Sequence, residues 1–259
     1  DDATRRMAVR RECHRYAKKF RDLQAKQMTR LLTAFGYDDA YMTMDPEYEQ
    51  KVVEVFAELI EQGLVYRDLK PVHWSIANET ALAEAELEYH DREDPSIYDG
   101  FEADDPQLLA RAFGADPKEL PDSLSFMIWT TTPWTLPAKL QIAVHEEFDY
   151  SLVTFGEKTG VVASELVGRV AQVEGVEAVE HGRCKGADLV GLRYRHPFVE
   201  PSDRSQSAWR IVAADYVTLE DGTGLVHTAP GHGAEDYDTG QREEIPIYCP
   251  VRGDGSYDV

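Results

Sequence analysis

The first third of the chain has the hydrophobic spacing of α-helices. Apolar residues over 7–31 recur mostly every three or four positions with Arg and Lys between them, which predicts a long helix that Gly36 ends. A second helix is predicted to begin after Asp45, a good N-cap, with Pro46 suited to its first turn. We expect its apolar side to face inward and Gly63 to end it.

The pattern then changes to short segments. Strict alternation of apolar and polar residues predicts a strand over 83–90, although its residues favour helices. Residues 91–121 are acidic and irregular, which indicates a connector or insertion with one short helix after Asp105 and Pro106. This first part of the chain, 1–121, is therefore expected to be helical and hairpin-like, with an acidic connector.

Residues 122–259 are rich in β-forming runs separated by Gly and Asp turns, with one helix predicted over 164–173. The predicted strands cover 126–131, 150–155, 160–163, 209–218 and 224–227. The expected fold class is mixed α/β: a barrel-like β body with flanking helices, preceded by two helices and a β-strand or hairpin segment.

Composition narrows the class of protein. With 259 residues and 42 % hydrophobic residues the chain can bury a sizeable core. Three widely spaced cysteines without a C-x-x-C pair argue against a disulfide framework or a local zinc site, and a reducing cytoplasm is expected. The sequence has no apolar run long enough to span a bilayer, so no membrane partner is expected.

Charge at first disfavours a nucleic-acid partner. The net charge is −21, but residues 1–35 carry +6, which leaves −27 on the remainder. Since phosphate binding relies on Lys and Arg, any nucleic-acid contact must be local or shared with other parts of a larger protein.

Two segments are unlike ordinary structural sequence. In the first, Thr130, Thr131 and Thr132 run from a predicted strand into a turn fixed by Pro133 and Pro137. Three adjacent hydroxyls can bind a small polar ligand and orient a water. Alternatively, the threonines are present only for their strand propensity.

In the second segment, a predicted strand over 224–228 brings His227 to its end, and a glycine-rich turn around His232 leads to Asp236 on the next helix. Glycines let a loop approach a ligand closely. Such histidines can also be ordinary packed residues, and a third possibility is that His227, His232 and Asp236 ligate a hydrolytic metal.

The sequence WTTTPWTLPA at 129–138 and the sequence GTGLVHTAPGHGAEDY at 222–237 closely resemble the inserted editing domain, connective peptide 1, of isoleucyl-tRNA synthetases in the class I family. Segments 70–75, 81–86 and 192–198 agree with this resemblance. Related valyl and leucyl enzymes read TTRP and PAHD where this chain reads TTTP and PGHG, so the resemblance is specific for isoleucine.

The resemblance implies post-transfer editing: hydrolysis of the ester that joins valine to the 3′ end of isoleucine tRNA. It implies that Thr130, Thr131 and Thr132 line the pocket and position the water. His227 would take part in substrate discrimination, and Asp236 would pair with the α-ammonium of the substrate, a charge-assisted contact.

The signatures of the ATP site in class I synthetases, of the HIGH and KMSKS types, are not found in the sequence. The chain is therefore expected to be part of a larger synthetase. Its expected partners are the 3′ end of isoleucine tRNA carrying valine and the rest of that synthetase. The chain itself is expected to need no cofactor, whereas the parent enzyme would use ATP and Mg²⁺. A metal-dependent esterase and a non-catalytic module that docks the tRNA acceptor end remain alternative functions.

Further residues are expected near the substrate. Trp129 flanks the threonine run, and Gly231, His232 and Gly233 form the turn before Asp236. Lys139 departs from the family, because many bacterial relatives have Asn at this position. Its side chain is expected either to contact a phosphate or the adenosine, or to point into solvent.

Overall fold

The computed structural model describes residues 2–33, 36–197 and 208–258. Residue 198, the last of the segment 192–198, therefore lies outside the described residues. The internal contacts divide the chain into two compact units, Asp1–Asp68 and Leu69–Val259. The β-rich sequence pattern begins near residue 122, whereas the unit that contains the strands begins at Leu69.

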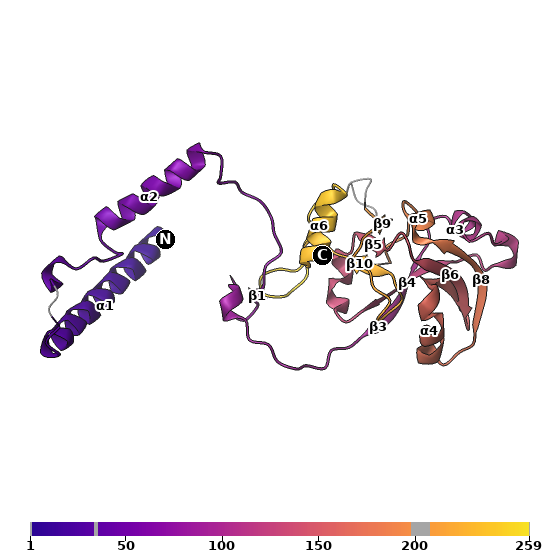
Figure 1. Cartoon of the computed structure of the whole chain (residues 1–259), viewed down its shortest axis with the longest axis horizontal. Helices are drawn as coiled ribbons and strands as arrows, with labels where there is room; N and C mark the ends of the chain where they lie inside the picture. The colour runs from indigo at the N-terminus through magenta and orange to yellow at the C-terminus, as the bar shows by residue number, and fades with distance from the viewer. Residues whose placement is uncertain (1, 34–35, 198–207, 259) are drawn as a thin grey trace. The chain divides into compact units, whose positions relative to one another are not determined.

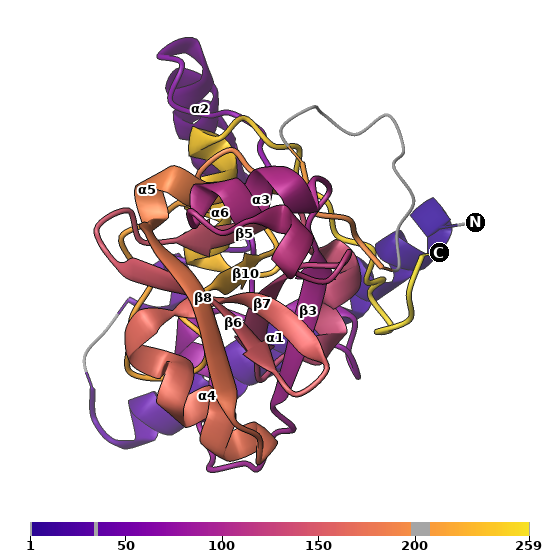
Figure 2. The same cartoon turned by 90° about the vertical axis from the view of Figure 1, so that its right-hand side faces the viewer.

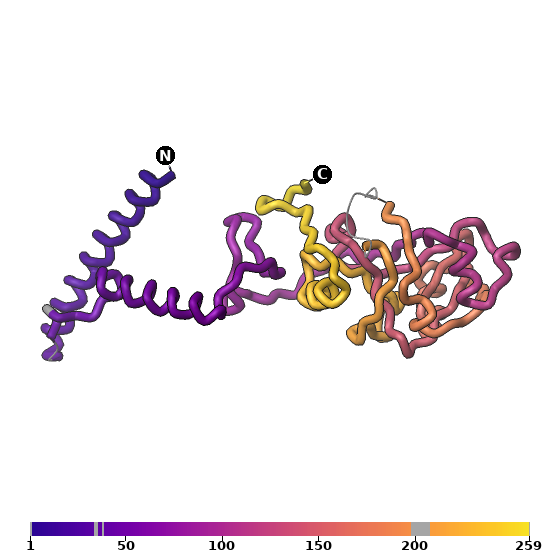
Figure 3. The backbone as a smooth tube through the Cα atoms, turned by 90° about the horizontal axis from the view of Figure 1, so that it is seen from above, coloured from indigo at the N-terminus to yellow at the C-terminus, as the bar shows by residue number. Residues whose placement is uncertain are grey.

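The described residues of the first unit form two helices and one short 3₁₀ turn. These are α1 (Asp2–Arg30), η1 (Tyr37–Asp39) and α2 (Pro46–Glu61), and Figure 3 shows α1 and α2 as two separate coils. Both helices were expected, and Asp45 is the N-cap of α2 with Pro46 in its first turn. The structure ends α1 at Arg30, earlier than the expected stop at Gly36.

The expectation that the apolar side of α2 faces inward is wrong for this chain. No residue of α2 is buried, and Phe56 and Ile60 are about half exposed, at 52 % and 50 %. Neither α1 nor α2 contains a buried residue. No described helix is long and apolar enough to cross a membrane.

The strands in the described part of the second unit form three sheets, and Figure 1 shows where their strands lie in this unit. A small ribbon pairs β1 (Trp74–Ser75) with β2 (Thr80–Ala81). The five-stranded sheet has the order β3 (Ile97–Glu102), β4 (Ser125–Thr130), β7 (Lys158–Ala163), β6 (Asp149–Phe155), β8 (Ala178–Lys185). The three-stranded sheet has the order β10 (Val226–Thr228), β5 (Gln141–Val144), β9 (Arg210–Ala213). The pairs β4–β7 and β5–β9 are parallel and the others are antiparallel.

Short helices join and cover these strands. They are α3 (Pro106–Ala112), α4 (Val167–Glu174), α5 (Gly186–Leu189), α6 (Ala234–Arg242), and the 3₁₀ turns η2 (Glu84–Glu86), η3 (Pro117–Glu119), η4 (Pro133–Ala138), η5 (Ser164–Leu166). The mixed α/β class is confirmed. The expected barrel is not closed, because the strands in the described part of the chain form separate open sheets.

Buried side chains lie on both faces of the five-stranded sheet along its central strands β4, β7 and β6. Figure 2 shows α4 beside this sheet. On one face Val170 of α4 packs with Met127 and Val162. On the other face the main core joins Phe126 of β4 to Ile142 of β5, so the two larger sheets share one core. Fully burying one such side chain contributes about 1.5–3 kcal/mol, so this core holds the two sheets together.

Two expectations about the middle of the chain are wrong. Residues 83–90 do not form a strand: η2 covers only Glu84–Glu86, and Tyr89 beyond it is 83 % exposed. The Glu86 carboxylate accepts a hydrogen bond from the Ala83 N–H (2.8 Å), which favours the turn. Conversely, β3 lies inside the expected connector and pairs with β4 along six residues.

Candidate active site

The threonine run folds back on itself at the end of β4. Pro133 opens η4, and its fixed φ angle favours the turn. The Thr132 carbonyl accepts hydrogen bonds from the backbone N–H of Thr135 (3.0 Å) and from its Oγ1 hydroxyl (2.8 Å). The bend therefore brings Thr130, Thr132 and Thr135 together.

His227 joins this group from β10. Its Nε2 lies 3.1 Å from Thr130 Oγ1 and 3.3 Å from Thr135 Oγ1. Thr130 Oγ1 also accepts the Thr132 N–H (3.0 Å) and lies 3.3 Å from Thr132 Oγ1. Thr130, Thr135 and His227 are at most 9 % exposed, whereas Thr132 is exposed. We call these four residues the threonine–histidine cluster.

The number of protons available determines which groups donate and which accept hydrogen bonds in the cluster. The single hydroxyl proton of Thr135 is used on the Thr132 carbonyl, so Thr135 Oγ1 must accept from His227, and Nε2 carries the imidazole proton. The one Nε2–H is shared between Thr135 Oγ1 and Thr130 Oγ1. Thr130 Oγ1 accepts it together with the Thr132 N–H, which leaves the proton of Thr130 for Thr132 Oγ1. The proton of the Thr132 hydroxyl is left to point out of the cluster.

The imidazole of His227 stays neutral at physiological pH. Burial, together with smaller effects of the nearby Lys139 and His232, lowers its pKa to about 3. Its Nδ1 is buried and has no hydrogen-bond partner among the described residues, so a second proton there would be unsatisfied. His227 therefore acts as a hydrogen-bond donor through Nε2, and it is too weak a base to take a proton from water at neutral pH.

Asp236 lies in the first turn of α6 and is tied to the end of β10. Its carboxylate accepts the backbone N–H of Ala229 (3.0 Å), two residues after His227. Burial raises the pKa of Asp236, the Ala229 N–H opposes this, and Glu235 adds to it. A carboxylate that is partly desolvated in this way gains stability from a cation that pairs with it.

The glycine turn before α6 is tightly packed. A Cβ on Gly231 would lie 2.4 Å from the Tyr248 carbonyl oxygen, and one on Gly233 would lie 3.0 Å from the Asp236 carboxylate. His232 packs edge-to-face on Trp134 with ring centroids 5.3 Å apart, and burial lowers its pKa. Only glycine leaves room for these approaches.

Not every predicted residue joins the cluster. Thr131 is exposed in the bend after β4, and Trp129 lies on the opposite face of β4 from Thr130, where it packs against Gly222. Lys139 does not point into solvent, and its amine is not open to a phosphate, because the side chain is only 1 % exposed. Thr135 was missed, although its position three residues after Thr132 is the usual spacing for a hydroxyl that bonds a turn carbonyl.

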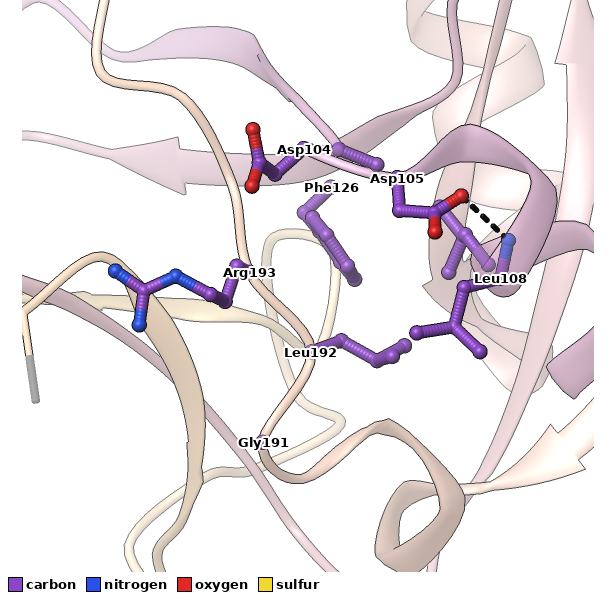
Figure 4. A pocket seen from close by; sticks show the side chains of 9 residues that line it. Asp104, Asp105, Leu108, Phe126, Gly191, Leu192 and Arg193 are labelled. Carbon is purple, nitrogen blue, oxygen red and sulfur yellow. Dashed lines mark hydrogen bonds between the residues drawn. The ribbon is translucent and has the colours of Figure 1, made fainter. Parts of the chain in front are cut away.

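The geometry does not favour a metal centre. No three His, Cys, Asp or Glu residues gather to hold a metal ion within the described ranges, and His227, His232 and Asp236 form no such group. A cavity of about 180 Å³ lies near the start of α3, beside Asp104 and Arg193 (Figure 4), and contains none of the predicted site residues.

The chain resembles known tRNA synthetases. The family described as "tRNA synthetases class I (I, L, M and V)" matches residues 3–230. Isoleucine–tRNA ligases from Carboxydothermus hydrogenoformans and Thermotoga neapolitana are each 42 % identical over 97 % and 96 % of this chain. The chain spans only 25 % of each of these relatives.

Similar solved structures include the editing domain of the cytosolic leucyl-tRNA synthetase from P. knowlesi. It is 15 % identical, with a TM-score of 0.46, and the match covers 57 % of this chain and 62 % of that one. The corresponding P. falciparum domain is 12 % identical, with a TM-score of 0.44, over 57 % and 66 %. On the strength of the match over 3–230, this chain belongs to the class I tRNA synthetase family.

Proposed function

We propose that the chain is the editing part of an isoleucine–tRNA ligase and hydrolyses the ester of valine mistakenly joined to isoleucine tRNA. The observation that carries this proposal is the directed hydrogen-bond chain that begins at His227 and ends at the outward hydroxyl of Thr132. The carboxylate of Asp236, fixed at the end of β10, supplies a site for a primary ammonium. The similarity to isoleucine–tRNA ligases supports the substrate class.

The chemistry requires little from the protein. The α-ammonium of valine pairs with Asp236, which places the ester near the threonines. Thr132 orients a water whose oxygen forms a bond to the ester carbonyl carbon, the bond to the ribose oxygen breaks, and that oxygen leaves with a proton. The ester is already activated, so positioning of the water can supply much of the rate.

Each threonine has a separate role in this proposal. Thr132 contacts the water, Thr130 passes the hydrogen bond of His227 to it, and Thr131, exposed in the bend, lines the pocket. We propose no covalent intermediate, since no Ser–His–Asp or Cys–His arrangement is evident in the sequence.

Such a site would distinguish valine from isoleucine by the size of the side chain. One methylene is worth only about 1–3 kcal/mol, a magnitude established on synthetases of this family, so a pocket for isoleucine accepts some valine. A second, smaller pocket can hydrolyse the valine product and exclude isoleucine, because overfilling a packed site is also costly.

The remaining steps are assigned to the rest of the enzyme. The chain spans a quarter of the ligases it matches, and we propose that ATP and Mg²⁺ bind in the other part of a cytoplasmic enzyme. The negative charge of −21 makes it reasonable that the other part also helps to hold the tRNA.

The direct test is valine release from valylated isoleucine tRNA, with isoleucylated tRNA as the control substrate. Asp236→Asn should abolish selective release, while Asp238→Asn, on the exposed side of α6, should retain it. Equal release of both amino acids would refute the size argument. If folded protein released neither and still bound the tRNA end, the chain would be a docking module.

A further inference from the structure

The 3₁₀ turn η4 contains a backbone carbonyl that the turn itself cannot satisfy. In a 3₁₀ helix the carbonyl of Trp134 would accept the backbone N–H of the residue three positions later. That residue is Pro137, which has no N–H. The carbonyl therefore needs a partner from outside the turn. The hydroxyl of Tyr257, 123 positions further along the chain, donates a hydrogen bond to it at 2.7 Å.

The same peptide unit takes part in the threonine–histidine cluster. The Trp134 carbonyl and the Thr135 N–H belong to one planar trans peptide, so they point in opposite directions. This N–H donates to the Thr132 carbonyl (3.0 Å), and Thr135 Oγ1 lies 3.3 Å from His227 Nε2. Tyr257 and Thr132 thus hold one rigid unit from its two sides. The position of this unit sets the position of the Thr135 hydroxyl in the cluster.

The Tyr257 hydroxyl tethers the turn as well as satisfying an oxygen atom. Trp134 is 50 % exposed, so water could also bond its carbonyl, but water would leave the turn free to shift. A hydrogen bond to a carbonyl also polarises the peptide and makes the N–H on its far side a stronger donor. Both effects stabilise the hydrogen bond from the Thr135 N–H to the Thr132 carbonyl.

Tyr257 lies in a short hairpin over 251–257 that packs on the ribbon of β1 and β2. Its backbone forms a bridge with that of Val251 in the opposite arm. The indole N–H of Trp74 in β1 donates to the Gly253 carbonyl (2.8 Å), and a Cβ on Gly253 would meet the same indole ring at 3.3 Å. The hairpin is therefore braced against the ribbon at its turn and contacts η4 through Tyr257.

We propose that Tyr257 is a positioning residue for the threonine–histidine cluster. Its hydroxyl fixes the peptide between Trp134 and Thr135, and the hydrogen bond from Trp74 keeps the hairpin in place. This hold on the cluster is a property of the fold and does not depend on which ester the site hydrolyses. The effect on catalysis rests on the proposed function, because there the position of the threonines sets the place of the attacking water.

The first test is NMR of the full chain with ¹³C at the tryptophan carbonyls and ¹⁵N in threonine. Only two peptides in the sequence join Trp to Thr, at 129–130 and at 134–135, so a carbonyl–amide correlation gives two signals and the first is an internal reference. Tyr257→Phe removes the hydroxyl and keeps the ring. We expect the Trp134 carbonyl signal to move upfield and the Thr135 amide to exchange with solvent about two- to tenfold faster.

The matched control is Tyr89→Phe, which removes the hydroxyl of a tyrosine that is 83 % exposed and should change neither signal. Trp74→Phe tests the brace, because it keeps an aromatic ring against Gly253 and removes the indole N–H. It should also speed exchange of the Thr135 amide, by less than Tyr257→Phe does. Unchanged exchange in folded Tyr257→Phe would overturn the proposal, and unchanged exchange in Trp74→Phe would overturn the part assigned to the brace.

Valine release tests the consequence for catalysis. Tyr257→Phe should lower kcat by about two- to tenfold with little change in KM, because the groups that contact the substrate are retained while the threonine hydroxyls shift. A rise in KM at unchanged kcat would overturn the positioning role. If wild type releases no valine, the proposed function fails, while the exchange measurements still decide the role of Tyr257.

Discussion

Stability at acid pH tests the assignment of a neutral, buried His227. The perturbation is His227→Gln, which keeps an N–H donor and removes the titrating ring. Burial lowers the pKa of His227 to about 3, well below the value of about 6.5 expected in the unfolded chain. A depressed pKa contributes stability that is fully present above pH 6.5 and is lost as the pH falls toward 3.

The magnitude follows from proton linkage. Below pH 6.5 the unfolded chain binds one proton at this residue that the folded chain does not, which costs about 1.36 kcal/mol per pH unit. Between pH 7 and pH 4.5 the wild type should therefore lose about 2.5 kcal/mol of unfolding free energy relative to His227→Gln. The result is insensitive to the folded pKa as long as that pKa stays about one unit or more below 4.5.

Urea unfolding at the two pH values measures this difference. Tryptophan fluorescence is a suitable probe because all four tryptophans lie in the second compact unit. The other titrating groups are shared by both proteins and cancel in the comparison. His73→Gln, at an exposed histidine, controls for loss of an imidazole. Equal losses of stability in wild type and His227→Gln would refute the assignment.

Three further predictions concern the rest of the site. Burial raises the pKa of Asp236, so at neutral pH its charge opposes folding. Asp236→Asn should unfold at higher urea than wild type, the gap closing as the pH falls, and a less stable variant at pH 7 would contradict this. Gly231→Ala should lose about 1–3 kcal/mol in the same assay because its Cβ meets the Tyr248 carbonyl at 2.4 Å. Gly168→Ala in α4, with open space around its Cβ, should lose nothing. Dialysis against EDTA should leave valine release unchanged, and activity lost there and restored by Zn²⁺ would restore the metal alternative.

Elements with strong local signals could be predicted from the sequence. The cap and proline pairs at Asp45 and Asp105 mark the starts of α2 and α3, since both act within one helical turn. The β-branched and aromatic runs that form β6 and β7 were also found. In each case the information is contained in fewer than ten consecutive residues.

The strands that the sequence pattern did not predict depend on pairing with neighbouring strands. β3 contains Asp99 and Glu102, which read as connector, and its pairing with β4 fixes it as a strand. β5 is four fully buried residues with no alternation, and β8 is a mostly exposed edge. Such segments become strands because a neighbouring strand offers hydrogen bonds, which a local pattern does not record.

In the candidate site, too, some features could be predicted from the sequence and others could not. The bend of the threonine run could be predicted from its prolines, but the contact of Thr130 with His227 joins residues 97 positions apart, and only the resemblance to a family placed them in one site. The burial of Lys139 had no signal at all, because lysine is normally exposed and its enclosure depends on Phe101 and Tyr194 from distant segments.

The separation of Thr130 and His227 has a structural consequence for the site. Thr130 ends a strand of the five-stranded sheet, while His227 lies in the three-stranded sheet. The two meet only because one core, which includes Phe126 and Ile142, holds the sheets together. The hydrogen-bond chain to Thr132 therefore depends on the packing of the core between the two sheets. Core substitutions that loosen the contact between the sheets should reduce the proposed release of valine before they unfold the protein.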